Sequence, residues 1–415
     1  MTLAHSLTCS LANLLTFSLY VHYPFCIHRC PYCGFATAVE RKNDSERYRS
    51  RLLEELRRRA EEPPWQGGRV SSIYFGGGTP SLMPPEFCSS ILQFVNSSIP
   101  EPTHRLTDPP TNQNSAIRNP QSEITLEANP GTRDAANFSA FRQAGVNRLS
   151  IGAQSFHPSE LRFLKRAHSV DDIGETVRMA REAGFNNVSL DLIYGVPGQT
   201  VDSFRNSVLR ALDLGIDHLS TYTLSIEEGT PFASDVKEGK MPAPNPDFAA
   251  DQYAILIDMM RDAGFEHYEL TNYAKPDKWS RHNFAYWQRT PYLGLGLGAH
   301  SFDGRRRFWN SRDSNVYCET LTRGEYPIEG WEDLDEKQEE EEGIYLSLRT
   351  RAGIAEETAS NLFNTVNMAS LLEGGFIRRE NGRFHIAESH WLLLDEIVLR
   401  LLRMPENWSG DSAPE

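Results

Sequence analysis

Between residue 18 and about residue 275, short β-branched or aromatic runs alternate with amphipathic stretches of helical length, and this alternation constrains the fold most. It is typical of repeated βα units on a parallel sheet. Helices are predicted over 45–62, 170–184 and 200–215, where apolar residues recur at i, i+3 and i+4. The predicted strands are SLYVHY (18–23), RVSSIYF (69–75), EITLEA (123–128), VNRLSIGA (146–153), NVSLDLIYG (187–195) and HLSTYTLSI (218–226). We therefore predict an α/β fold whose six parallel strands either stay open or curl into a partial (βα)6 TIM-like barrel, with ligands at their carboxyl ends.

Composition shifts divide the chain further. Residues 97–122 contain five prolines and almost no large apolar residue, which indicates a polar insertion at the surface of the core. The acidic run WEDLDEKQEEEE (331–342) indicates a solvated helix start more than an interaction tail, and it marks a boundary. The predicted parts are an N-terminal extension (1–17), the core (18–275), a connecting segment (276–330), a C-terminal domain (331–405) and a tail (406–415).

The predicted C-terminal domain has its own pattern. The segments EEGIYLSLRTRAGI, NTVNMASLLEGGFIRRENGRFHIAE and SHWLLLDEIVLRLLR indicate helix, helix, short hairpin and helix. This order predicts a small winged-helix-like α+β domain, of a size that can just support its own core.

Charge and hydropathy exclude several classes of protein. The net charge of −14 gives no general attraction to polyanions, so we predict no nucleic-acid partner. No run reaches about 18 uncharged apolar residues, so no transmembrane helix is predicted. The apolar stretch Leu11 to Phe17 has no Lys or Arg before it and continues into a strand-like segment, which speaks against a signal peptide. We expect a cytoplasmic protein.

Three of the six cysteines, Cys26, Cys30 and Cys33, form a C-x3-C-x2-C motif. Thiolates on a short loop suit an iron–sulfur cluster or zinc. Structural zinc usually takes four closed ligands in paired C-x2-C knuckles, and Cys9, Cys88 and Cys318 are isolated. The spacing therefore favours a cluster held by three thiolates with one iron left open, and zinc stays the alternative.

Polar residues gather at the predicted carboxyl ends of the strands. Glu127, Gln154 and Asp191 lie at or just beyond strand ends, and Arg166 is placed on a following helix. Residues at that rim bind ligands more often than they serve structure, although any single one could cap a helix. In YFGGGTPS (74–81), the run Gly76 to Gly78 would let the backbone approach a ligand closely, and Thr79 offers a hydroxyl.

The cysteine loop directly after the first strand of a βα repeat resembles the radical S-adenosylmethionine (SAM) superfamily, and Tyr32 before the last cysteine fits that pattern. The resemblance implies a partial barrel of the radical SAM type. It also implies that Cys26, Cys30 and Cys33 hold a 4Fe–4S cluster whose fourth iron is chelated by SAM.

Further motifs narrow the resemblance over about residues 18–400. YVHxPFC, GGGTPS, LEANP, RLSIGAQSF, DLIYGVPGQT, ELTNYAKP, SRHNFAYW and LGLGLGAHS resemble the branch with oxygen-independent coproporphyrinogen III oxidase and the HemW-type haem chaperones. The C-terminal domain is then of the type found in this branch. The implied SAM contacts are Tyr20, Tyr32, Gly77, Gly78, Thr79, Glu127, Gln154, Arg166 and Asp191, with Ser225 and His300 at further contact positions.

One position separates the two kinds of protein in this branch. The oxidase continues its motif to C-x3-C-x2-C-x-C, whereas Phe35 stands here, as in the chaperones. Only 25 residues precede Cys26, fewer than the oxidase's long N-terminal arm. The resemblance therefore implies a haem chaperone that passes haem to apo-haem acceptor proteins, membrane-associated in the family, and it allows a homodimer. The alternative is the oxidase or another radical SAM enzyme of porphyrin metabolism, so enzymatic activity stays open.

A haem carrier needs an axial ligand for iron, and His is a common one. His282 in SRHNFAYWQ stands beside Tyr286 and Trp287, and this motif is associated with haem in the chaperone branch, so His282 is the predicted ligand. The alternative is a histidine bonded within a domain junction. His28 and His22 are further candidates that fit better as residues tuning the cysteine loop. The glycines of LGLGLGAHS (293–301) lack dinucleotide-binding spacing, so we predict a close-packed turn near the SAM site.

Overall fold

The computed structural model describes residues 15–39, 44–98, 122–131 and 135–402. The predicted tail, most of the 97–122 insertion and residues 1–14 of the predicted extension lie outside the described residues. Within the described part of the chain, no helix is long and apolar enough to cross a membrane.

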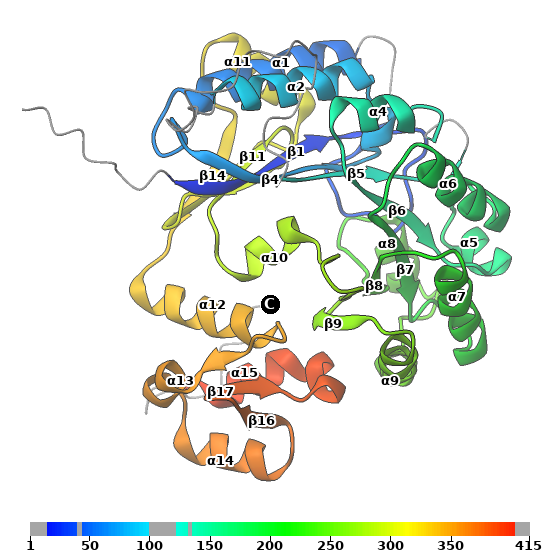
Figure 1. The fold of residues 1–415 in the computed structure, drawn as a ribbon, viewed down its shortest axis with the longest axis vertical. Coiled ribbons are helices and arrows are strands. Elements are labelled where there is room, and N and C mark those ends of the chain that lie inside the picture. Colours follow the sequence, from blue (N-terminus) through cyan, green and yellow to red (C-terminus); the bar gives the residue numbers. More distant parts are fainter. Residues whose placement is uncertain (1–14, 40–43, 99–121, 132–134, 403–415) are drawn as a thin grey trace, which may run out of the picture.

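The predicted alternation of strands and helices is confirmed. Six strands run parallel and neighbour one another in chain order: β1 (Thr16–Tyr23), β4 (Arg69–Gly77), β5 (Glu123–Ala128), β6 (Arg148–Gln154), β7 (Val188–Tyr194) and β8 (His218–Thr223). Helices cover the outer face of this sheet (Figure 1), among them α1 (Asp44–Ala60), α2 (Pro85–Ser98), α4 (Phe138–Ala144), α6 (Val170–Glu182) and α7 (Val201–Asp213). The three helices predicted from periodicity correspond to α1, α6 and α7.

The sheet is wider than the six predicted strands and stays open. On one side, β11 (Tyr292–Leu295) lies parallel to β1, and the antiparallel strands β12 (His300–Phe302), β13 (Arg306–Asn310) and β14 (Ile328–Asp333) follow. On the other side, β8 is followed by β10 (Asn272–Ala274) and β9 (Glu266–Glu269), both antiparallel to their neighbours. The result is a twelve-stranded mixed sheet with β14 and β9 at its edges.

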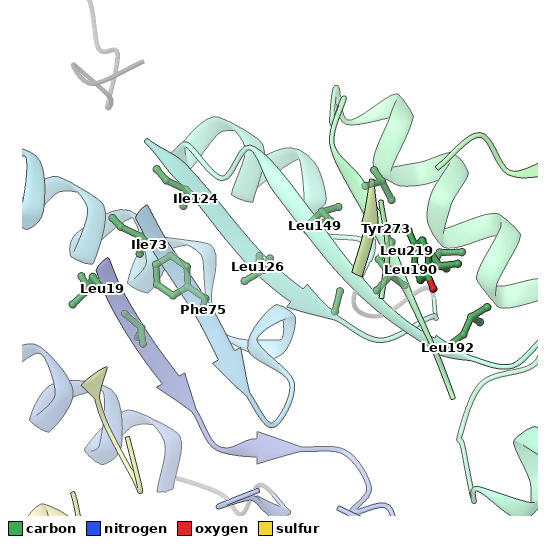
Figure 2. Close-up of a cluster of buried hydrophobic side chains, with 14 of the residues drawn as sticks. Leu19, Ile73, Phe75, Ile124, Leu126, Leu149, Leu190, Leu192, Leu219 and Tyr273 are labelled. Atoms are coloured by element: carbon green, nitrogen blue, oxygen red, sulfur yellow. The ribbon is translucent and has the colours of Figure 1, made fainter. Parts of the chain in front are cut away.

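The two faces of the sheet differ in chemistry because successive side chains of a strand point to opposite faces. Register neighbours such as Leu19 and Ile73, or Leu126 and Leu149, are buried in the hydrophobic core on one face (Figure 2). The residues between them are polar. Ser18, Ser72, Thr125, Arg148, Ser150 and Ser189 are all buried on the opposite, inner face.

A short helix, α10 (Arg281–Trp287), lies against this polar inner face (Figure 1). The Glu123 carboxylate accepts hydrogen bonds from the backbone N–H groups of Arg281 and His282, each at 3.0 Å. Glu123 thus satisfies the otherwise unpaired N–H groups at the start of α10, which fixes this helix inside the curve of the sheet.

The C-terminal segment begins with α12 (Glu336–Leu348), capped by Asp335 and Gln338, so the acidic run opens a solvated helix as expected. Trp331, just before it, still belongs to β14 and pairs with Phe308. The following elements are β15 (Ile354–Ala355), α13 (Glu356–Leu362), α14 (Thr365–Glu373), β16 (Ile377–Glu380), β17 (Arg383–Ile386), η2 (Glu388–Leu393) and α15 (Leu394–Leu401). Helix, helix, hairpin and helix follow in the predicted order as α12, α14, β16–β17 and α15, and the structure adds the short strand β15, the short helix α13 and the 3-10 helix η2.

Candidate functional site

The three motif cysteines lie on the loop that leaves β1. Cys26 ends the short strand β2 (Phe25–Cys26), which pairs with β3 (Ala38–Val39), and a turn with a 3.2 Å bond from Cys33 N–H to the Cys30 carbonyl follows. All three are free thiols, and they line one cavity of about 690 Å³ at the carboxyl ends of the parallel strands. We call it the cysteine cavity. Across the described ranges, no three His, Cys, Asp or Glu side chains converge on a single metal ion.

The environment of these thiols suits a cofactor that takes thiolates. Burial raises the pKa of Cys26 to about 11 and raises that of Cys33, so the protein environment by itself favours the neutral thiols. A bound metal centre reverses this preference because it binds the thiolate. The Arg166 guanidinium donates a hydrogen bond to Cys30 Sγ at 3.3 Å and would partly balance that charge. The donor set therefore fits an iron–sulfur cluster.

The glycine run after β4 is required by packing as well as by any ligand. Gly77 has φ +118°, and a Cβ atom there would lie 2.6 Å from the ring of His22. A Cβ atom on Gly78 would lie 2.5 Å from the carbonyl oxygen of Pro24. Only glycine lets this loop lie against the segment that carries the cysteines.

Two half-buried carboxyl groups face the cysteine cavity. Glu127 accepts hydrogen bonds from Tyr74 Oη at 2.9 Å and from the backbone N–H of Gly77 at 3.0 Å. Asp191 accepts one from Ser150 Oγ at 3.1 Å. Burial raises the pKa of Glu127 to about 7 and that of Asp191 to about 6. Acids held in this way are poised to accept hydrogen bonds from a cationic or hydroxyl-bearing ligand.

The prediction that Arg166 lies on a helix is wrong. It lies in the turn between α5 (Pro158–Phe163) and α6, where Lys165 has φ +53°. From this turn the guanidinium donates to the Gly152 carbonyl at 2.9 Å and to Asn129 Oδ1. Asn129 in turn donates to Thr79 Oγ1 at 2.9 Å. Asn129 was missed, although its place two residues after Glu127 follows the same strand-end rule.

Most of the predicted contact residues line the cysteine cavity together with the three cysteines. They are Tyr32, Gly77, Gly78, Thr79, Glu127, Gln154, Arg166, Asp191 and Ser225. Gln154 ends β6 with φ +65°, and Ser225 donates to Glu227 at 2.8 Å. Tyr20 and His300 lie elsewhere.

Tyr20 and His300 line a second cavity of about 530 Å³, which we call the aromatic cavity. It lies between α10, β11–β13 and α12, and its walls include Tyr286, Trp287, Tyr292 and Phe302. Gly34 and Phe35 line both cavities, so the two adjoin at the cysteine loop.

His282, the predicted haem ligand, lies in neither of these cavities. His282 is only 1% exposed, and both of its ring nitrogens form hydrogen bonds. Nδ1 bonds with Ser72 Oγ and Nε2 with Tyr286 Oη, each at 2.9 Å. Burial lowers the pKa of His282 to about 3. In this arrangement no nitrogen of His282 is available to iron, and its bonds are those of a structural histidine.

The other two histidine candidates also differ from each other. His22 is buried, its ring nitrogens bond to Tyr20 Oη at 3.0 Å and the Ala36 carbonyl at 2.9 Å, and burial lowers its pKa to about 4. His28 is exposed and lines the cysteine cavity.

The glycine-rich turn before His300 is close-packed, as predicted. A Cβ atom on Gly294 would collide with the His300 carbonyl oxygen, and one on Gly296 with Tyr48 Oη. Glycines at these positions let β11 and β12 fold back on each other beside α1.

Comparison with known proteins agrees with this site. The model of the radical SAM superfamily matches residues 20–211. The chain is 34% identical over 389 residues to "Heme chaperone HemW" of Mycobacterium tuberculosis, and the matched region covers 93% of this chain and 95% of the relative. It is 30% identical over 388 residues to "Heme chaperone HemW" of Bacillus subtilis, and the matched region covers 92% of this chain and 97% of the relative.

A solved structure adds evidence on the fold. Coproporphyrinogen III oxidase (HemN) from Escherichia coli matches with a TM-score of 0.75 over 93% of this chain and 90% of that chain, at 23% sequence identity. The predicted radical SAM type of α/β fold is thereby confirmed. With a C-x3-C-x2-C loop after the first strand and relatives matched along nearly their full length, the chain belongs to the radical SAM superfamily and, within it, to the HemW family.

Proposed function

We propose that this protein is a haem chaperone that binds haem and transfers it to acceptor haem proteins, and that it carries a SAM-coordinated 4Fe–4S cluster. The observation that carries the proposal is the match to relatives named heme chaperones over more than nine tenths of the chain. The cysteine cavity and Phe35 at its rim support it, because Phe35 stands where the oxidase pattern has a fourth cysteine.

Cys26, Cys30 and Cys33 would hold the cluster. When bound, such a cluster exchanges single electrons and offers one iron to a further ligand. Arg166 contributes a positive charge beside Cys30 and is fixed by Gly152 and Asn129. We expect Arg166 to moderate the negative charge of the thiolates.

The remaining residues of the cysteine cavity would bind SAM. Glu127 is oriented by Tyr74 and Gly77, so its carboxylate is positioned to accept a hydrogen bond from the ammonium group of SAM. Asp191, which already accepts a hydrogen bond from the Ser150 hydroxyl, lines the same cavity and suits hydroxyl groups. Gly77, Gly78 and Thr79 complete this side of the cavity. Tyr20 and His300 could touch only a ligand that extends past Phe35 into the aromatic cavity.

Three finer parts belong to the proposal. The cytoplasm as the place of action is the expectation from the sequence, whereas membrane-associated haem proteins as acceptors and a homodimer are implied by family resemblance. Light scattering of the purified protein tests the dimer. Transfer of haem to vesicle-embedded apo-acceptors, compared with soluble ones, tests the preference for membranes.

The second candidate is an oxygen-independent coproporphyrinogen III oxidase, favoured by the fold shared with HemN. One experiment separates the two. The cluster is reconstituted anaerobically, and haem binding, haem transfer and coproporphyrinogen decarboxylation with SAM and reductant are measured on the same sample. We expect haem binding and transfer without decarboxylation. Robust decarboxylation would overturn the chaperone proposal.

A further inference from the structure

The aromatic cavity has the shape and wall chemistry of a site for a flat apolar ring. Tyr286 and Tyr292 meet edge to face with ring centroids 4.7 Å apart, and Trp287 and Phe302 extend the same lining. Trp287 Nε1 is buried without a hydrogen-bond partner among the described residues. At about 530 Å³ the cavity lies in the range of cofactor-sized sites. Nothing in the proposed SAM site uses these walls.

Arginines surround this cavity. Glu342 forms ion pairs with Arg289, at 3.0 Å, and with Arg307, which also pairs with Glu332 at 2.6 Å. Arg312 is exposed and donates to the Gly34 carbonyl at 2.6 Å, and in the described part of the chain it forms no ion pair with a carboxylate. Its charge therefore remains available to an anionic group of a ligand.

His300 stands at the start of β12, in the wall of the cavity. Its ring stacks on Trp309 with centroids 5.5 Å apart, and no hydrogen bond of its ring nitrogens is found among the described residues. This differs from His22 and His282, whose nitrogens are all engaged. His300 is exposed at the mouth of the cavity, and partial desolvation, helped by Arg307 and Arg312, lowers the pKa of its ring, which favours the neutral imidazole. The neutral imidazole is the form that binds iron.

We infer that the aromatic cavity is the porphyrin site, that His300 supplies an axial ligand to the haem iron, and that Arg312 pairs with a propionate. This inference rests on the proposed function, because it names the place and ligand of the haem that a chaperone carries. In this arrangement Gly34 and Phe35 form a short wall between the haem and the cluster.

The first experiment titrates haemin into the full-length, cluster-reconstituted protein and records difference absorbance spectra. We expect His300→Ala to shift the Soret band and to weaken haemin binding by about tenfold or more, and free imidazole to restore the wild-type spectrum. His157→Ala is the matched control, because His157 is exposed and its ring bonds to Ser159, away from both cavities. Equal iron and sulfide contents and circular dichroism spectra show that each variant is folded.

The second experiment separates coordination from pocket binding with iron-free protoporphyrin IX, followed by fluorescence. His300→Ala should leave this affinity unchanged, whereas Arg312→Glu should weaken both protoporphyrin and haemin by about fivefold or more. Arg305→Glu, an exposed change on the neighbouring turn, controls for net charge.

The outcomes distinguish the two proposals. If wild-type protein binds no haemin, the chaperone function fails. If it binds haemin but His300→Ala keeps the wild-type affinity and spectrum, the assignment of His300 is wrong and the chaperone function stands. If His282→Ala alone abolishes the Soret band in a protein that remains folded, α10 must leave its place to bind haem, and the inference is overturned.

Discussion

The cysteine cavity and the aromatic cavity meet at Gly34 and Phe35, yet the chain builds them in different ways. The cysteine cavity is made by the ends of parallel strands and the loops that follow them, so its groups are backbone N–H donors, thiols and half-buried acids. The aromatic cavity is made mainly by α10, β11–β13 and α12, which follow one another within residues 281–348 and contribute rings and arginines. The first therefore suits a polar ligand at a metal centre and the second a large apolar one, and changes in one should leave the other intact.

The largest expected effect is in the cysteine cavity. Cys26→Ala should remove nearly all cluster iron, because the cluster needs three thiolate ligands and the variant would keep only two. Iron and sulfide per chain after anaerobic reconstitution measure this. Cys88→Ala, a buried cysteine of the core, should keep the full content. Full cluster iron in Cys26→Ala would contradict the radical SAM assignment of this loop.

The next largest effect is expected for Glu55, whose hydrogen bonds hold the turn beside the aromatic cavity. Glu55 is fully buried and accepts hydrogen bonds from Gly296 N–H at 3.0 Å, and from Asn310 Nδ2 and Tyr317 Oη at 2.7 Å. Glu55→Ala leaves these donors unsatisfied and should lower the free energy of unfolding by about 3 kcal/mol. Urea unfolding followed by circular dichroism measures it, with Glu54→Ala, a partly exposed neighbour, expected to lose less than about 1 kcal/mol.

In folded Glu55→Ala protein we also expect weaker haemin binding with unchanged cluster content, because Gly296 belongs to the turn that precedes His300. Loss of the cluster with haemin binding preserved would contradict the separation of the two cavities.

A smaller effect concerns pH. With a pKa of about 7, Glu127 is mostly protonated at pH 6 and ionised at pH 8, so the affinity for SAM should rise by up to about tenfold over this range. The stability of SAM-free protein should change in the opposite direction. Between pH 4.5 and 7 the folded carboxyl holds a proton that the unfolded one loses, so the free energy of unfolding falls as pH rises.

Calorimetric titration of reconstituted protein with SAM and unfolding of SAM-free protein measure the two trends. Glu127→Gln should flatten both, and Glu228→Gln, on the exposed loop after β8, should keep both. A SAM affinity independent of pH in the wild type would remove Glu127 from the ligand site.

The smallest effect is expected at the shared wall. Phe35 is 65% exposed, so Phe35→Ala should change the free energy of unfolding by less than about 0.5 kcal/mol. Because Phe35 lines both cavities, affinity for SAM and for haemin should each fall by about twofold to fivefold. Val39→Ala, 53% exposed and outside both cavities, is the control. A loss confined to one ligand would show that Phe35 serves only one cavity.

The core of the fold was predictable because local pattern decides it. All six parallel strands and the three helices named from periodicity lie within a few residues of their predicted bounds. The strands β11 to β14 were not predicted, since they are short and β11 joins the parallel sheet through pairing with the distant strand β1, as Leu293 does with Leu19. Such long-range pairing leaves no local signal.

The candidate site, like the fold, could be predicted only in part. Glu127, Gln154 and Asp191 follow from the rule that parallel strands bring their carboxyl ends together. That rule cannot place Tyr20 and His300, because their cavity depends on how β11 and β12 fold back. Nor can it show that His282 is engaged on both nitrogens, which follows only from the position of α10.

The position of α10 has different consequences for the two cavities. The ring of Tyr74 lies 5.0 Å from that of His282 and also lines the cysteine cavity, while Tyr286 bonds His282 and lines the aromatic cavity. The helix α10, anchored by Glu123, therefore lines the aromatic cavity directly through Tyr286 and reaches the cysteine cavity only through the ring of Tyr74. A shift of α10 along the strands would therefore reshape the aromatic cavity at once, and it would affect the cysteine cavity only by changing the packing behind Tyr74.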